Sequence, residues 1–224
     1  MKIFTIIKEE SKRIPDKNFT DLNGHPLWWH LLSELNGLDV TVNTDSQKFI
    51  NQLRSTNLTS LKVIKRLQKH IDWENNEDLD SSPVEDMLFE FCKTIDISEI
   101  VVLTHVTSPF IKKETIFAAV DALQNDIKSK SIHSVQQVQD FVWLKQAGEA
   151  SPVNFFPDRV QHTQDLLPIM VSKGAFFIAK AGDILDQRSR LPKPLLFFPL
   201  DHMQATEIDN FEDLEFARFL GGSR

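Results

Sequence analysis

The stretch Lys2-Ile3-Phe4-Thr5-Ile6-Ile7 is a run of β-branched and apolar residues, and Lys8-Glu9-Glu10-Ser11-Lys12-Arg13-Ile14-Pro15-Asp16-Lys17-Asn18 follows it directly. A segment that is apolar on both faces is typical of a strand inside a parallel sheet. The polar segment cannot extend that strand, because Pro15 and Asp16 break regular structure. We therefore expect a buried strand over residues 2–7 and a basic loop over residues 8–18.

Strand and helix patterns alternate beyond this loop. Runs rich in β-branched residues predict strands at Leu38–Val42, Leu61–Lys65 and Glu99–Leu103. Helical patterns cover Pro26–Leu35, Ser46–Arg54, Pro83–Lys93 and Thr115–Gln124. This alternation predicts an α/β fold with a mostly parallel sheet and helices on both faces.

The second half of the chain is less regular. We expect Ile132–Val138 and Asp140–Leu144 to pair as neighbouring strands, and further strands at Gly174–Ala179 and Leu195–Leu200. A final helix begins after Asn210, which is a favourable capping residue. Residues 145–167 are polar and interrupted by prolines, so we interpret them as an insertion that makes dimer contacts within a single domain over residues 1–224.

The composition excludes several classes of protein. Of the 224 residues, 41% are hydrophobic and 25% are charged, as in a folded globular domain, and no apolar run is long enough to cross a membrane. The net charge of −7 and the lack of a basic stripe predict no binding of nucleic acid. The single cysteine, Cys92, and an N-terminus that does not resemble a signal peptide predict a cytoplasmic protein without an intrachain disulfide.

The basic loop is the first candidate site, because ligands of such sheets bind outside the carboxyl ends of the strands. Cationic and neutral donors of the kind that bind a triphosphate are concentrated there: Lys8, Ser11, Lys12, Arg13, Lys17 and Asn18. A solvated basic loop without a ligand is the alternative interpretation of the same residues.

Two acidic residues near the C-terminus form a candidate metal site. Glu207 and Asp209 are two positions apart, so in an extended segment both carboxylates project to one side. Such a pair suits Mg²⁺, which binds one or two carboxylates together with phosphate oxygens. Alternatively, the two charges favour the N-terminus of the following helix.

Polar residues also follow the strand predicted at Glu99–Leu103. Thr107 and Ser108 can position a substrate with their hydroxyls, or they can cap the helix that follows. His105 has no metal-binding partner at a telling spacing, so a substrate contact and a structural role are equally open. Arg66 follows the third predicted strand, where an exposed surface arginine is the ordinary interpretation.

These segments together resemble the sugar-acid cytidylyltransferases, the group typified by CMP-sialate synthetases. Ser11-Lys12-Arg13-Ile14-Pro15 with Lys17-Asn18 is similar to the signature loop of that family. Thr44-Asp45, Thr107-Ser108-Pro109, Gly174-Ala175-Phe176-Phe177 and Glu207-Ile208-Asp209 resemble its later motifs, in the same order and across nearly the whole chain. The resemblance implies a three-layer, Rossmann-like nucleotidyltransferase fold.

The chain also departs from the family pattern. Lys8 stands in place of an arginine, and Glu9 and Glu10 stand in place of small residues where backbone approaches the phosphates. Lys173 replaces an asparagine, while Val106 and Ile111 replace a proline and an arginine on the acceptor side. We therefore expect an atypical member of the family with an unusual acceptor or impaired chemistry.

The resemblance implies a homodimer that joins CMP from CTP to an acidic sugar, such as a nonulosonic acid, with release of pyrophosphate. In that reaction Lys8, Lys17 and Asp209 would be catalytic, and Ser11, Lys12, Arg13, Asn18 and Arg66 would also contact the nucleotide. His105, Thr107, Ser108 and Lys173 would contact the acceptor, while Asp209 and Glu207 would bind Mg²⁺. Two alternatives stay open: another anionic acceptor such as a phosphonate, or a catalytically silent relative that binds a nucleotide or a partner.

Overall fold

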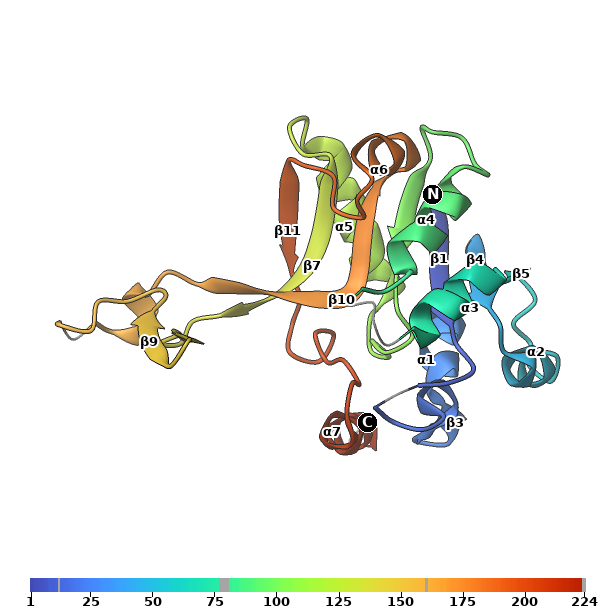
Figure 1. The fold of residues 1–224 in the computed structure, drawn as a ribbon, viewed down its shortest axis with the longest axis horizontal. Coiled ribbons are helices and arrows are strands. Elements are labelled where there is room, and N and C mark those ends of the chain that lie inside the picture. Colours follow the sequence, from blue (N-terminus) through green and yellow to red (C-terminus); the bar gives the residue numbers. More distant parts are fainter. Residues whose placement is uncertain (12, 77–80, 160, 223–224) are drawn as a thin grey trace.

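The computed structural model describes residues 1–11, 13–76, 81–159 and 161–222. Within them lies a seven-stranded sheet with the order β11-β7-β10-β6-β1-β4-β5 (Figure 1). Strands β1 (Lys2–Ile7), β4 (Val40–Thr44), β5 (Leu61–Lys65) and β6 (Ile100–Leu103) are parallel. Strand β10 (Ile169–Lys180) runs antiparallel to β6 and to β7 (Ser131–Val138), and β11 (Leu195–Pro199) is parallel to β7. The predicted α/β fold with a mostly parallel sheet is confirmed.

Helices cover both faces of this sheet because the side chains of β1 alternate between two hydrophobic cores. Ile3 and Ile7 pack in the core with α1 (Leu27–Glu34), α2 (Gln47–Leu53) and α5 (Lys113–Asn125). Phe4 and Ile6 pack in the opposite core with α4 (Val84–Cys92) and α6 (Ala181–Gln187). Burial on both faces explains why the β1 sequence is apolar throughout.

A third, smaller apolar cluster joins the two ends of the chain. It contains Ile14 from the loop after β1, Leu22 from β2 (Asp21–Leu22), and Leu214 and Ala217 from α7 (Phe211–Gly222). The short β3 (His25–Pro26) and the 3-10 helix η1 (Lys17–Phe19) complete the connection between that loop and α1. Packing of Ile14 against α7 therefore brings the basic loop next to the C-terminal segment.

A long arm leaves the sheet where β7 and β10 extend beyond their neighbours (Figure 1). Its tip is an antiparallel hairpin of β8 (Trp143–Gln146) and β9 (Glu149–Pro152), followed by the 3-10 helix η2 (Thr163–Asp165). The predicted pairing of Ile132–Val138 with Asp140–Leu144 is wrong, because β7 pairs with β10 and β11 instead. The strand propensity of residues 132–138 predicted β7 correctly. Its partners could not be predicted, because β7 lies inside the sheet, with Ile132 and Val135 buried, and is flanked by strands that are distant in sequence.

Smaller differences concern the ends of elements. Strand β4 begins at Val40 rather than Leu38 and extends to Thr44. Helices α3 (Gln68–Asn75) and α6 were not predicted, and α3 buries only His70, so its sequence lacks an apolar stripe. The predicted cap of the last helix is confirmed, since the side chain of Asn210 accepts a hydrogen bond of 2.9 Å from the backbone N–H of Asp213. No helix in the described ranges is both long enough and apolar enough to span a membrane.

Because β10 lies inside the sheet and β11 at its edge, we expect substitutions on these two strands to change the free energy of unfolding by different amounts. Phe176 is fully buried in the core beneath α5, whereas Phe197 on the edge strand β11 is 45% exposed. Phe176→Ala leaves a cavity in the core and should lower the free energy of unfolding by about 3–5 kcal/mol. Phe197→Ala should lower it by less than about 1 kcal/mol. Urea unfolding of both variants measures these values, and equal losses would contradict the layer arrangement.

Candidate nucleotide site

The carboxyl ends of β1, β4, β5 and β6 lie at one edge of the sheet because these strands are parallel. The residues that follow them are Lys8, Asp45, Arg66 and the segment from Thr104 to Ser108. A cavity of about 330 Å³ opens at this edge. Its polar lining comes from segments far apart in the sequence, namely Lys8, Ser11, Arg13, Lys17, Asn18, Glu74, His105, Thr107 and Asp209.

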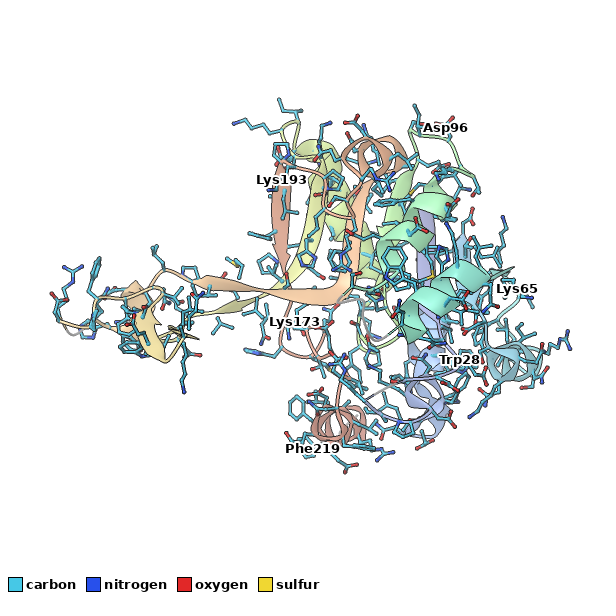
Figure 2. All side chains as sticks on the ribbon, in the orientation of Figure 1. Trp28, Lys65, Asp96, Lys173, Lys193 and Phe219 are labelled. Atoms are coloured by element: carbon cyan, nitrogen blue, oxygen red, sulfur yellow. The ribbon has the colours of Figure 1, made fainter. Side chains whose placement is uncertain are left out.

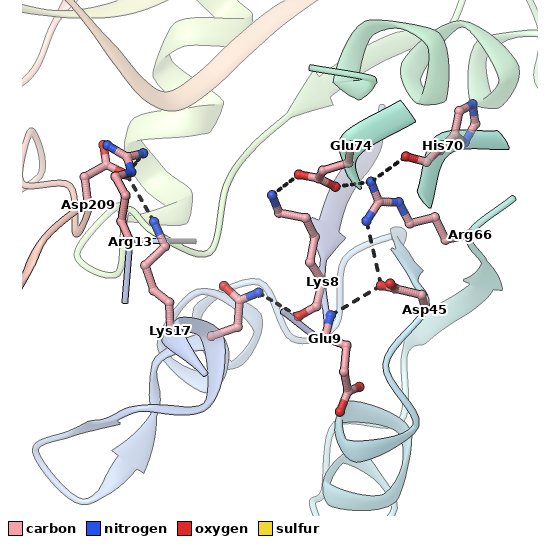
Figure 3. Close-up of polar contacts among 10 residues, drawn as sticks. Lys8, Glu9, Arg13, Lys17, Asp45, Arg66, His70, Glu74 and Asp209 are labelled. Carbon is pink, nitrogen blue, oxygen red and sulfur yellow. Dashed lines mark hydrogen bonds and ion pairs between the residues drawn. The ribbon is translucent and has the colours of Figure 1, made fainter. Parts of the chain in front are cut away.

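The basic loop and the C-terminal segment meet at Asp209 (Figure 3). Its Oδ1 atom accepts hydrogen bonds from Arg13 Nη2 at 2.6 Å and from Lys17 Nζ at 3.1 Å. Lys17 also donates to the carbonyl oxygen of Ile208 at 3.1 Å. Burial lowers the pKa of Lys17, and the charges of Arg13 and Lys8 lower it further, whereas Asp209 opposes the shift. These three residues thus form one charge cluster.

Lys8 and Arg66 are joined by a residue that the sequence analysis missed. Glu74 on α3 binds Lys8 with one carboxylate oxygen and Arg66 with the other (Figure 3). The Arg66 side chain is only 2% exposed, and it also donates to the carbonyl oxygen of His70 and lies 3.8 Å from Asp45 Oδ1. Arg66 is therefore a buried, ion-paired residue rather than a surface arginine.

The remaining loop residues have different surroundings. The Asn18 amide donates to the carbonyl oxygen of Lys8 at 3.0 Å, which fixes the loop to the end of β1, and Ser11 lines the cavity. Glu9 donates its backbone N–H to Asp45 Oδ1 at 3.3 Å, and Figure 3 shows its carboxylate pointing away from Lys8 and Arg66. Glu9 and Glu10 line a neighbouring hollow instead. Lys12 lies outside the described residues.

The end of β6 supplies the other wall of the cavity. His105 and Thr107 line it, and the Thr107 carbonyl oxygen accepts a hydrogen bond of 2.8 Å from the backbone N–H of Ile208. Helix α5 begins after Lys112, so Thr107 and Ser108 do not cap it, and that alternative is wrong. The Ser108 hydroxyl is buried without a partner among the described residues. Burial, with a smaller effect from the charge of Arg190, lowers the pKa of His105 to about 4.

Glu207 is held against the backbone of β10. Its Oε1 atom accepts a hydrogen bond of 2.6 Å from the backbone N–H of Gly174, and a Cβ atom at that glycine would lie only 2.5 Å from the same oxygen. A side chain at residue 174 would therefore require the Glu207 carboxylate to move. Lys173 Nζ lies 3.9 Å from Glu207 Oε2, and Figure 2 shows Lys173 where β10 leaves the sheet for the arm.

The two carboxylates fit the predicted magnesium ion. Glu207 and Asp209 line a second cavity of about 520 Å³, and Asp209 borders both cavities. Both ion pairs of Asp209 go to Oδ1, and no hydrogen bond to a described residue uses Oδ2. Burial raises the pKa of Glu207, and the nearby charge of Asp209 adds to the effect. No cluster of three or more metal-binding side chains exists in the described ranges, so phosphate oxygens would have to complete the coordination of such an ion.

The sequence carried little signal for Glu74 and Asp45 as members of this site. Glu74 lies on a helix without an apolar stripe, eight residues after Arg66. Asp45 belongs to a sequence motif, but that motif does not show what the side chain contacts. Its contacts with the N–H of Glu9 and with Arg66 form because β1, β4 and β5 are neighbouring strands. Only the sheet order brings these groups together.

The chain is similar to several known proteins. Residues 9–151 match the family model described as cytidylyltransferase. A CMP-N,N'-diacetyllegionaminic acid synthase from Legionella pneumophila is 29% identical over 210 residues, which cover 87% of this chain and 84% of that protein.

Solved structures show the same fold at low identity. A CMP:2-keto-3-deoxy-manno-octonic acid synthetase complexed with CTP has a TM-score of 0.66 and 16% identity, covering 99% of this chain and 98% of the other. A 4-diphosphocytidyl-2C-methyl-D-erythritol synthase from Anaerococcus prevotii has a TM-score of 0.66 and 14% identity, covering 99% and 96%.

Because the pKa of His105 is low, we expect the free energy of unfolding to depend on pH. The folded protein keeps this imidazole neutral down to about pH 4, whereas the unfolded chain protonates it near pH 6.5. The unfolded state therefore binds more protons between these values, so the free energy of unfolding should fall as the pH drops from 6.5 to 4. His105→Gln should reduce that slope in urea unfolding, and the exposed His162→Gln is the control. An unchanged slope in His105→Gln would contradict the burial of the imidazole.

Proposed function

The chain belongs to the cytidylyltransferase family, since the family model matches more than half of it, and from this premise we propose that it joins CMP to an acidic sugar. CTP would be the donor substrate and pyrophosphate the second product. The observation that carries the proposal is the meeting of Lys8, Arg13 and Lys17 with Asp209, nearly 200 residues away, around one cavity. A basic loop that only interacts with solvent would not be expected to pair with a carboxylate distant in sequence and to line a cavity with it.

The cations of the site suit a triphosphate. Lys8 pairs with Glu74, and Arg13 and Lys17 both pair with Asp209. Phosphate oxygens can replace those carboxylates as charge-assisted acceptors, and they can neutralise the same cations. The burial of Lys17 strengthens its interaction with an anion, because the local dielectric is low. We assign Lys8 and Lys17 to the developing charge of the leaving pyrophosphate, and Ser11, Lys12, Arg13 and Asn18 to nucleotide binding.

Arg66 has a supporting role in this proposal. Its guanidinium is buried and binds Glu74, Asp45 and the backbone of α3, so it holds the end of β5 and α3 beside the nucleotide. A direct contact with the nucleotide would require the ion pair with Glu74 to open. We therefore infer that nucleotide binding and the release of Glu74 are linked at this residue.

Asp209 and Glu207 would hold the metal ion. Mg²⁺ would supply positive charge to the phosphate oxygens during the transfer. The Oδ2 atom of Asp209 and the Oε2 atom of Glu207 are the oxygens without hydrogen bonds to other described residues, which supports their assignment as ligands. Asp209 also orients Arg13 and Lys17, so its carboxylate contributes to nucleotide binding as well as to metal binding.

The reaction needs positioning and electrostatic stabilisation rather than a covalent enzyme intermediate. A hydroxyl oxygen of the acceptor forms a bond to the α-phosphorus of CTP, and the bond from that phosphorus to the bridging oxygen of pyrophosphate breaks. The hydroxyl proton passes to water. His105 stays neutral at ordinary pH, so it can donate or accept a hydrogen bond to the acceptor without adding charge.

The acceptor class is proposed from the relatives and the second cavity. The Legionella relative is named for an acidic sugar product, and one structural neighbour is named for another. The cavity of about 520 Å³ shares Asp209 with the first cavity, and its other polar lining residues are Gln136, Lys173, His202, Thr206, Glu207, Asn210 and Asp213. We propose that the acceptor lies between the two cavities, with His105 and Thr107 on one side and Lys173, shared with Glu207, on the other. Ser108 is fully buried, so its contact with the acceptor would require this hydroxyl to become exposed.

We also propose a homodimer in the cytoplasm. The arm exposes large apolar side chains, among them Trp143, Leu144 and Phe156, which are all more than half exposed. Exposed apolar groups on a projecting arm favour contact with a partner, and a second copy of the chain is the simplest one. The arm includes the segment 145–167 that the sequence analysis interpreted as an insertion.

Nucleotide choice tests the proposed donor. CTP with Mg²⁺ at about 100 times its dissociation constant should stabilise the protein by about 2.7 kcal/mol. For a chain of this size that corresponds to a rise in melting temperature of roughly 5–10 °C. UTP, ATP and GTP at the same concentration should give smaller rises. Equal rises from all four nucleotides, or none from CTP, would contradict the proposed donor.

The carboxylates test the proposed metal site. Asp209→Asn removes an anionic ligand and keeps the shape of the side chain, so the turnover number should fall about 100-fold or more. Glu207→Gln should have a smaller effect. The control is Glu212→Gln, an exposed position in the first turn of α7. Pyrophosphate release measures turnover, and urea unfolding verifies the fold. Full activity of Asp209→Asn would show that this carboxylate serves the ion pairs alone.

A further inference from the structure

A cluster of aromatic and basic side chains lies beside the cavity on the face of the sheet covered by α4 and α6. The guanidinium of Arg190 lies over the ring of Phe177, with its carbon 4.4 Å from the ring centroid. His133 stacks on the same ring at 4.4 Å, and the His105 ring lies edge-on to it at 6.0 Å. Because His105 lines the cavity, Phe177 places Arg190 close to the candidate site.

Arg190 differs from the other shielded arginines in the described ranges. Arg66 contacts Glu74 and Arg218 contacts Glu215, whereas no ion pair joins the half-buried Arg190 to any described carboxylate. Glu85 Oε1 accepts a hydrogen bond of 3.3 Å from the backbone N–H of Arg190, so this contact involves the main chain and not the guanidinium. The guanidinium therefore has five donors and a positive charge without an ion-pair partner among the described residues.

The neighbours of Arg190 do not compensate its charge. His133 Nε2 lies 2.9 Å from the Ser172 hydroxyl and its Nδ1 lies 3.3 Å from the carbonyl oxygen of Phe176, so both ring nitrogens have partners. Burial lowers the pKa of His133 and of His105, and the charge of Arg190 lowers both further. Both imidazoles are thus neutral at ordinary pH. A shielded cation among neutral rings lacks a counter-ion, which is costly unless a ligand supplies one.

We propose that Arg190 is a specificity-determining residue that binds the oxyanion group of the acceptor, the carboxylate of an acidic sugar, beside His105. The inference rests on the proposed function and adds the residue that recognises the acceptor charge. A guanidinium binds a carboxylate through two parallel hydrogen bonds, so it sets orientation as well as affinity. The ring of Phe177 supports the guanidinium from below and leaves its edge free for those bonds.

Lys173 is the competing candidate for this role, and the contacts favour Arg190. Lys173 lies 3.9 Å from Glu207 Oε2, so its charge already has a carboxylate nearby. It lines the second cavity, whereas Arg190 is connected to the His105 ring through the ring of Phe177. An acceptor carboxylate at Arg190 would gain an unpaired cation, whereas at Lys173 it would compete with Glu207.

The test combines a change in the protein with a change in the acceptor. Sialic acid and 2-keto-3-deoxy-manno-octonic acid are each compared with their uncharged carboxamides, in wild-type protein and in Arg190→Gln. Either change alone should lower kcat/KM for the acceptor about tenfold or more, and the two together should lower it no further. KM for CTP should stay within about twofold. Independent, multiplying losses would overturn the proposal.

The matched control is Arg188→Gln, two residues earlier. Arg188 also lies over a phenylalanine ring, that of Phe89 at 5.3 Å, but it is exposed to solvent, so its removal should leave acceptor kinetics unchanged. Arg190→Lys keeps the charge without the fork, and it should recover only part of the loss. Urea unfolding verifies that each variant is folded.

Binding measurements separate this proposal from the proposed function. If CTP fails to stabilise the wild-type protein, the nucleotide assignment falls. If CTP binds but isothermal titration detects neither acid in its presence, the Arg190 proposal is overturned while the nucleotide assignment stands. Equal binding of an acid by wild-type protein and Arg190→Gln overturns it as well.

Discussion

Strand β1 hydrogen-bonds to β4 on one side and to β6 on the other, and its side chains are buried on both faces of the sheet. Ile3 and Ile7 belong to one core, and Phe4 and Ile6 to the other. Because β1 lies between β4 and β6 and runs parallel to both, the residue that follows it, Lys8, lies between Asp45 and Thr104 at the edge of the sheet. Everything that the site contains depends on that edge, because the parallel neighbours deliver their polar residues to it.

Carboxylates of the protein offset part of the positive charge of the site. Glu74 pairs with both Lys8 and Arg66, and Asp209 pairs with both Arg13 and Lys17, so two carboxylates are shared among four cations. In the nucleotide complex that we propose, phosphate oxygens would replace these carboxylates as partners of the cations. Such an exchange limits the cost of keeping several cations close together without a ligand. It also links α3, which carries Glu74, to the state of the site.

The two sides of the site differ in how closely they follow the family pattern. The donor side keeps the basic loop, and Glu9, the residue least expected there, turns its carboxylate away from Lys8 and Arg66 (Figure 3). The side that we propose for the acceptor carries His105 and Arg190 against Phe177, with Lys173 near Glu207. A shared nucleotide with a distinct acceptor would produce this division, because the phosphates impose the same requirements in every member while the acceptor does not.

The sequence by itself determined the sheet, the layers and the loop that forms the site. Apolar runs such as Lys2–Ile7 and periodic segments such as Pro26–Leu35 are local patterns, and local patterns are sufficient to define strands and helices. The order of the motifs also identified the family. Only the tertiary structure decided which strands pair, since β7 bonds to β10 and β11 across dozens of residues rather than to the segment beside it. Only the tertiary structure also showed that Glu74 binds Lys8 and that no described carboxylate forms an ion pair with Arg190. The physical reason is that an ion pair depends on the distance between two groups in space, and a local sequence pattern does not show which distant residues the fold brings together.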